Sequence, residues 1–323
     1  MTRKRKSIIL ALGVCAAAGV IAFTALPHRS ETEEVYQISY IYRGEMPEGV
    51  QQIILQGMEQ AATSFNVELT TVSSGTPADA KKQETLLKKE VDNGADAILI
   101  ESVNSDDVRK EIEKINSEIP VIEVNSWTQK EKTGEIHKVH ADNYALGQKL
   151  GEKILGQSEL SEGVVLIKSG TEYTDVAQQY KGTKDKLEAS GISIEEVKVG
   201  ADEAAHSAAF LKLMRKPKTR HIVAFGSAVL EQLGKVKQEE PDFNSIAIYG
   251  IGNTNQIINY LENGIIQVIG VSNEYSIGYL SVRNAVKELR GEEPENNEIR
   301  YSIIDASQMY TMENQRLLFP FVQ

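Results

Sequence analysis

From residue 35 onward, short apolar runs alternate with longer stretches in which apolar residues recur at helical spacing. "VYQISYIY" at 35–42 has the pattern of a buried strand, and "ADAILI" at 95–100 that of an apolar strand. "GVQQIILQGMEQAATSF" at 49–65 and "SDDVRKEIEKINSE" at 105–118 have the spacing of amphipathic helices. Strands that alternate with helices predict a parallel sheet with helices on both faces.

The same alternation begins again with "EGVVLIKSG" at 162–170 and continues to residue 289. The stretch 65–91 runs parallel to 190–214 at an offset of about 125 residues, which indicates an internal repeat. We therefore expect two similar, doubly wound α/β lobes. Ligands of open parallel sheets bind at the carboxyl ends of the strands, so two facing lobes predict a ligand cleft between two such edges.

The first thirty residues have a different pattern. "TRKRK" precedes Ile8–Leu26, a run of 19 residues without a charged side chain. A helix of that length spans roughly 29 Å, about the thickness of the hydrocarbon core of a bilayer. The basic cluster before the run predicts a cytoplasmic N-terminus and an exported remainder.

Three interpretations of this segment stay open. It is an uncleaved anchor in the cytoplasmic membrane, a signal peptide cleaved near Leu26, or a lipoprotein signal in which Cys15 of "LGVC" carries the lipid. All three predict that the main part of the chain works outside the cytoplasm. We favour the anchor because the apolar run is long enough to fill a bilayer.

Charge and cysteine content narrow the possible functions. All 46 acidic residues and 30 of the 35 Lys and Arg lie after residue 30, so this part carries a formal charge of −16. Binding to nucleic acid needs a basic face, which excludes nucleic acid as an expected partner. Cys15 is the only cysteine of the chain, so the exported part has no disulfide and no thiolate nucleophile.

Motifs of catalysis and of cofactor binding are incomplete. "YGIGNTNQII" at 249–258 resembles a dinucleotide loop, but Asn255 stands where the third glycine is required. His137 and His140 are three residues apart in a predicted strand and point to opposite faces, so they cannot share a metal ion. Ser227 follows a strand without an identifiable base. We therefore expect no catalytic residue, no metal and no cofactor, and predict that the protein is not an enzyme.

The ends of the predicted strands carry the amide, hydroxyl and charged side chains that bind a polyol, together with an aromatic ring that can stack on it. The candidate ligand-binding residues are Arg43, Gln51, Asn125, Trp127, Gln179, Ser227, Asn253 and Asn273. Structural roles compete with this interpretation. Arg43 could be a solvated loop charge, Asn125 an Asx turn and Trp127 a ring packed on a hinge. Ser227, Asn253 and Asn273 could cap helices.

Several stretches resemble the type I periplasmic sugar-binding proteins, the ribose/galactose-binding group that supplies ABC transporters. The resemblance covers residues 35 to 323 and is carried by "GVQQIILQGMEQAA", "NGADAILIESVNSDDV", "IPVIEVNS", "VHADNYALGQKLGEKI" and "NNEIRYSIIDASQMYTMENQ". The membrane segment stands where the related repressors have a DNA-binding motif. The charged sugar contacts of the group align with neutral residues here, namely Asn125–Ser126, Gln179, Gly226–Ser227 and Gly252–Asn253. A different sugar bound by amides, or a site without a small sugar, would explain this change.

The resemblance also implies how the chain is divided. An N-terminal lobe would comprise 35–141 plus 273–304, and a C-terminal lobe 142–272 plus 305–323, joined by three crossovers that close as a hinge. The implied function is an extracytoplasmic solute-binding protein, tethered to the membrane, that delivers a sugar or similar molecule to a permease or signals it to a sensor histidine kinase. The alternative function is an exported glycan-active hydrolase.

Overall fold

The computed structural model describes residues 35–44, 49–75, 78–128, 136–157, 160–169, 172–200 and 203–319. All of them belong to one unit, Val35–Gln323. The predicted membrane segment lies outside the described residues. No helix in the described ranges is both long and apolar enough to cross a membrane.

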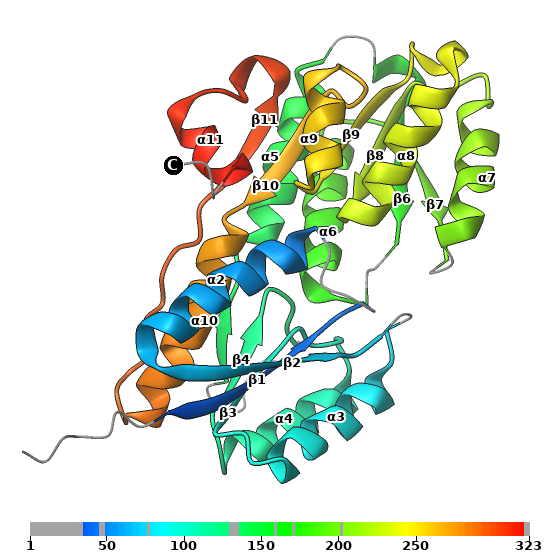
Figure 1. Cartoon of the computed structure of the whole chain (residues 1–323). Coiled ribbons are helices and arrows are strands. Elements are labelled where there is room, and N and C mark those ends of the chain that lie inside the picture. Colours follow the sequence, from blue (N-terminus) through cyan, green and yellow to red (C-terminus); the bar gives the residue numbers. More distant parts are fainter. Residues whose placement is uncertain are drawn as a thin grey trace, which may run out of the picture. The chain divides into compact units, whose positions relative to one another are not determined.

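The described strands form two separate sheets, and each sheet is the centre of one lobe (Figure 1). The five-stranded sheet has the order β2-β1-β3-β4-β5 and is parallel throughout. Its strands are β1 (Tyr36–Tyr42), β2 (Val67–Ser73), β3 (Ala97–Ile100), β4 (Val121–Val124) and β5 (His137–Val139). Its helices are α2 (Val50–Phe65), α3 (Ala80–Asp92), α4 (Asp106–Asn116) and α10 (Glu274–Leu289).

The six-stranded sheet has the order β11-β10-β9-β8-β6-β7. Its strands are β6 (Val164–Lys168), β7 (Ile194–Lys198), β8 (His221–Phe225), β9 (Ala247–Ile251), β10 (Val268–Ser272) and β11 (Tyr301–Asp305). Its helices are α5 (Asn143–Leu155), α6 (Thr174–Ala189), α7 (Glu203–Met214), α8 (Ser227–Glu239), α9 (Asn255–Glu262) and α11 (Met312–Leu318). Short 3-10 turns lie at Leu160–Glu162, Pro241–Phe243 and Ala306–Gln308.

Alternate residues of each strand pack against opposite helix layers. Tyr40 of β1 lies in a core with Met58 of α2 and Val282 of α10, whereas the adjacent Ile41 lies in a core with Leu87 of α3. Figure 1 shows α2 and α10 on one face of this sheet and α3 and α4 on the other. Burial on both faces explains why β3 (AILI) is apolar without interruption, whereas β2 (VELTTVS), at the edge of the sheet, is partly exposed and mixes polar with apolar residues.

The chain passes between the lobes at three places, which lie between β5 and α5, between β10 and α10, and between α10 and β11. One predicted boundary is wrong. Residues 301–304 were expected in the N-terminal lobe, but β11 pairs with β10 in the six-stranded sheet, from Ser272 with Tyr301 to Val268 with Asp305. The third crossover therefore ends before Tyr301. This pairing is antiparallel, so the second sheet is not parallel throughout as predicted.

Candidate functional site

The carboxyl ends of strands from both sheets meet along a seam between the lobes. Val103, after β3, forms an antiparallel bridge with Tyr173, and the Asn104 backbone N–H donates to the carbonyl of Glu172 at 2.9 Å. The backbone N–H of Thr174 donates to the hydroxyl of Ser126 at 2.9 Å. Direct hydrogen bonds thus join the loops after β3 and β4 to the start of α6.

Arg43, which follows β1, crosses the seam. Its Nη1 lies 2.9 Å from Oδ1 of Asp175 and its Nη2 lies 2.6 Å from Oδ2, a bidentate pair between lobes. Its guanidinium also lies 4.7 Å from the ring centroid of Tyr173 and, through Nε, 3.5 Å from Glu101. Burial opposes the positive charge, but attraction to Asp175 and Glu101 outweighs it and raises the pKa of Arg43. The structure therefore places Arg43 in a buried ion pair and not on a solvated loop.

Two further predicted residues join this group. Gln51, in the first turn of α2, hydrogen-bonds Glu101. Asn125 adopts a left-handed φ of 59° after β4, and its Nδ2 donates to Oδ2 of Asp175 at 3.2 Å. Burial raises the pKa of Glu101, whereas Arg43 and Gln51 act in the opposite direction. Arg43, Gln51 and Asn125, far apart in sequence, are thus gathered around two carboxylates that sequence reasoning did not place together.

Trp127 lies beside this group but stacks within its own lobe. Its ring lies parallel to that of His140, with centroids 3.9 Å apart and an interplanar angle of 19°. The backbone carbonyl of Trp127 accepts a hydrogen bond from the hydroxyl of Thr174, across the seam. Burial lowers the pKa of His140, which immediately follows β5 at the first crossover. The indole therefore packs on the crossover, and its stacking on a ligand stays a prediction.

The other four predicted residues lie on the second lobe or at its crossover. Gln179 of α6 is buried, and its Nε2 donates to Asn143 at 2.8 Å. Asn253, after β9, donates from Nδ2 to Glu274 at 3.1 Å, and its Oδ1 has no hydrogen-bond partner within the described residues. Asn273 caps α10, because its side chain accepts from the Ser276 N–H at 3.0 Å.

Ser227 begins α8, and its hydroxyl also lacks a hydrogen-bond partner in the described part of the chain. The start of α2 approaches it from the first lobe. A Cβ added at Gly49 would lie 3.6 Å from Oγ of Ser227 and 2.7 Å from Cγ2 of Thr254. Ser227 and Asn253 thus bring unsatisfied polar atoms to neighbouring strand ends, where a ligand hydroxyl could complete their hydrogen bonds.

Two charged residues of the site escaped sequence reasoning. Asp175 is only 3% exposed although it lies in the first turn of α6, and Glu274 is 5% exposed in the first turn of α10. Acidic residues at helix starts are common for reasons of helix stability, so their type and position gave no functional signal. Among the described residues, no three His, Cys, Asp or Glu side chains are arranged so that they could hold a metal ion.

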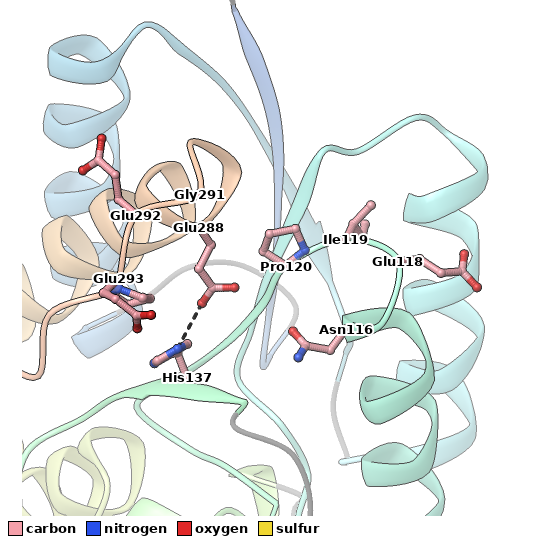
Figure 2. A pocket seen from close by; sticks show the side chains of 10 residues that line it. Asn116, Glu118, Ile119, Pro120, His137, Glu288, Gly291, Glu292 and Glu293 are labelled. Carbon is pink, nitrogen blue, oxygen red and sulfur yellow. Dashed lines mark ion pairs between the residues drawn. The ribbon is translucent and has the colours of Figure 1, made fainter.

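A cavity of about 330 Å³ lies elsewhere, at the amino edge of the first sheet (Figure 2). Its lining includes Glu118, Glu288 and His137, and Nε2 of His137 lies 3.5 Å from Oε1 of Glu288. Burial raises the pKa of Glu288, whereas His137 lowers it. Because Pro120 precedes β4 and His137 begins β5, this cavity is at the opposite strand ends from the seam.

Comparison with known families agrees with the two-lobe architecture. The sequence profile of the family described as "Periplasmic binding protein domain" matches residues 46–293. The chain belongs to the periplasmic binding protein family. This assignment agrees with the expected extracytoplasmic location. A search of curated protein sequences found no significant match.

Solved structures share the fold of this periplasmic binding protein at low sequence identity. A carbohydrate transporter solute-binding protein from Agrobacterium radiobacter, in complex with D-arabinose, has a TM-score of 0.79 and 18% identity. That alignment covers 88% of this chain and 98% of the other. A glucose-galactose binding protein from Geobacillus stearothermophilus has a TM-score of 0.75 at 18% identity, over 86% of this chain and 100% of the other.

A carbohydrate transporter from Acidothermus cellulolyticus, in complex with myo-inositol, has a TM-score of 0.73 at 18% identity, over 85% and 95% of the two chains. A LacI-type transcriptional regulator from Bacteroides fragilis matches with a TM-score of 0.74 at 13% identity, over 85% of this chain and 99% of the other. The fold is therefore shared by proteins of different function, and the likeness in fold does not identify a ligand for this chain.

Proposed function

We propose that this protein is an extracytoplasmic solute-binding protein that takes a sugar or similar polyol between its lobes. The observation that carries the proposal is the convergence of buried polar side chains from strand ends of both sheets, with unsatisfied atoms on Ser227 and Asn253. Hydroxyl groups of a polyol supply both donors and acceptors to such atoms. Solved relatives of the same fold hold D-arabinose, tagatopyranose and myo-inositol.

Each lobe is built around one of the two sheets. The N-terminal lobe is 35–141 with α10, the C-terminal lobe is 142–272 with β11 and α11, and the crossovers act as the hinge. A ligand that contacts both lobes favours their closed arrangement in proportion to its differential affinity. We expect the radius of gyration from small-angle scattering to fall when ligand is added. An unchanged radius at saturation would argue against hinge closure.

Calorimetric titration with pentoses, hexoses, disaccharides and inositols tests the binding function directly. We expect at least one neutral polyol to bind, and Asn253→Ala to weaken its binding by on the order of 1–3 kcal/mol, because a buried acceptor is lost. The exposed Asn259→Ala on α9 is the matched control and should bind normally. Absence of heat with every polyol would reject a carbohydrate ligand.

The N-terminal segment is proposed to tether the protein to the cytoplasmic membrane. A tethered binding protein can present its ligand to an ABC permease or to a sensor histidine kinase, and the partner that co-purifies from detergent extracts would distinguish the two. The alternative, a glycan-active hydrolase, predicts release of reducing sugar from oligosaccharides, which a solute-binding protein does not cause.

A further inference from the structure

Asp175 is a carboxylate of the second lobe that binds donors of the first. Nη1 and Nη2 of Arg43 lie 2.9 and 2.6 Å from its two oxygens, and Nδ2 of Asn125 lies 3.2 Å from Oδ2. The residue is 3% exposed, and the side chain of Arg43 is 13% exposed. Three N–H donors from two loops thus converge on one carboxylate that arrives from across the seam.

This arrangement is the one that a carboxylate-bearing ligand would need. Two parallel bonds from a guanidinium give bidentate recognition of a carboxylate, and an amide N–H adds a third contact. Tyr173 covers the guanidinium face at 4.7 Å and restricts its orientation. Donors of the first lobe, oriented by Tyr173 of the second lobe, therefore form a carboxylate site, and α6 inserts its own carboxylate into it.

We propose that Asp175 acts as a built-in ligand that latches the two lobes together and excludes carboxylate-bearing molecules from the cleft. A sugar acid could reach Arg43 only by displacing Asp175, which would leave a buried carboxylate without its partner. Removing one member of a buried pair is strongly unfavourable. Glu101, which is fully buried 3.5 Å from Arg43, adds negative charge against any anion. The ion pair stabilises the closed arrangement in the absence of sugar, and a bound sugar shifts the remaining open molecules toward it. The exclusion of sugar acids rests on the proposed function.

Rescue of Asp175→Ala by formate in the full-length protein tests the latch. The variant removes the carboxylate and leaves the donors of Arg43 and Asn125 in place. We expect its melting temperature to fall by on the order of 5–10 °C, because a buried ion pair is broken in a domain of this size. Sodium formate should restore much of the loss, and sodium chloride at equal ionic strength should not.

Two controls separate the latch from general salt effects. Asp185 lies on the same helix, pairs with Lys181 and is more exposed than Asp175. Formate should therefore not change the melting temperature of Asp185→Ala. The double variant Arg43→Met/Asp175→Ala lacks the anion-binding side chain and should also not respond to formate. A formate effect of equal size in Asp175→Ala and in the double variant would overturn the latch.

Sugar acids test the exclusion, and Asp175→Asn keeps the measurement possible if the alanine variant does not fold. The wild type should prefer D-galactose or D-arabinose to D-galacturonate, D-glucuronate and D-arabinonate. In either Asp175 variant the affinity ratio should shift toward the acids by roughly ten-fold or more. An unchanged ratio would refute the role in specificity. If formate rescues Asp175→Ala but no sugar binds the wild type, the latch is retained and the proposed function is rejected. If a sugar binds but formate does not rescue the variant, the proposed function is retained and the latch is rejected.

Discussion

Glu274 makes the stability of this protein depend on pH in an unusual direction. The carboxyl group lies at the start of α10, beside the second crossover, and is 5% exposed. Oε1 accepts from the Ser272 hydroxyl at 2.9 Å, and Oε2 accepts from Nδ2 of Asn253 at 3.1 Å. These hydrogen bonds do not offset the loss of hydration, and burial raises the pKa of Glu274 to about 7.

The sign follows from proton linkage. A glutamate in the unfolded chain titrates near pH ~4.3, so between that pH and about 7 the native state binds more protons than the unfolded state. The free energy of unfolding contributed by this group therefore falls as pH rises through that window and stays constant above it. With ~1.4 kcal/mol per pKa unit, the total loss is on the order of 3 kcal/mol.

Glu274→Gln removes this titration and keeps the shape of the neutral acid. The amide retains an oxygen for Ser272 and offers N–H donors to Asn253, whose Oδ1 has no partner among the described residues. Urea denaturation of both proteins at pH 5, 6, 7 and 8 should show that the free energy of unfolding of the variant increases relative to that of the wild type as pH rises. The gain should reach on the order of 3 kcal/mol by pH 8.

The exposed Glu313→Gln in α11 is the matched control and should follow the wild type at every pH. Other carboxylates change the stability of both proteins equally, so the difference between them isolates Glu274. A difference in unfolding free energy that is the same at pH 5 and pH 8 would falsify the assignment of a raised pKa to this residue.

Three further predictions concern a ring, a helix contact and the N-terminus. Trp127→Ala should weaken sugar binding by on the order of 1–3 kcal/mol if the indole stacks on ligand, and full affinity by calorimetry would exclude that role. Gly278→Ala would place a Cβ 1.9 Å from the carbonyl oxygen of Ile54, so we expect a loss of about 3 kcal/mol or more by urea denaturation; Gly156→Ala, whose Cβ would be 3.4 Å from its nearest neighbour, should be nearly neutral. Mass spectrometry of membrane extracts should find the N-terminal segment intact, and a mature N-terminus near Leu26 would contradict the anchor.

The two lobes could be predicted because their pattern is physically constrained. Strands buried on both faces must be apolar throughout, and the helices between them must present one apolar face. The internal repeat then gave two lobes with facing strand ends. The position of β11 could not be obtained this way. "YSIID" at 301–305 has the same composition whether it pairs with the first sheet or with β10 of the second.

The placement of polar residues directly after strands could be predicted from the sequence, whereas the contacts that these residues make across the seam could not. Their role in ligand binding stays a prediction. Arg43 and Asn125 follow β1 and β4, and the structure brings both to one carboxylate. Asp175 follows no strand directly, and its partner Arg43 is 132 residues away in sequence. A single sequence contains no measure of such a distance, so the charged centre of the seam became visible only in three dimensions.

Two of the crossovers lead into helices that begin in the same way, with a capping side chain followed five residues later by a glycine. "DNYALG" at 142–147 opens α5, and "NEYSIG" at 273–278 opens α10. Asp142 caps its helix by accepting from the Ala145 N–H at 2.9 Å, as Asn273 does in α10. The glycine five residues on lets each helix approach its neighbour closely, because a Cβ at Gly147 would lie 2.2 Å from the carbonyl oxygen of Gln179.

This repeat explains which residue of each crossover is available to the seam. The capping side chains of Asp142 and Asn273 are committed to their own helices. The residues that follow them, Asn143 and Glu274, are buried and receive hydrogen bonds from Gln179 and from Asn253, respectively. Both helices are fixed at their first turn by a cap and by close packing, so bending between the lobes must be concentrated in the few residues before each cap. Asn143 therefore moves together with Gln179 in the second lobe, whereas Glu274 moves with α10 of the first lobe and its hydrogen bond with Asn253 crosses between the lobes.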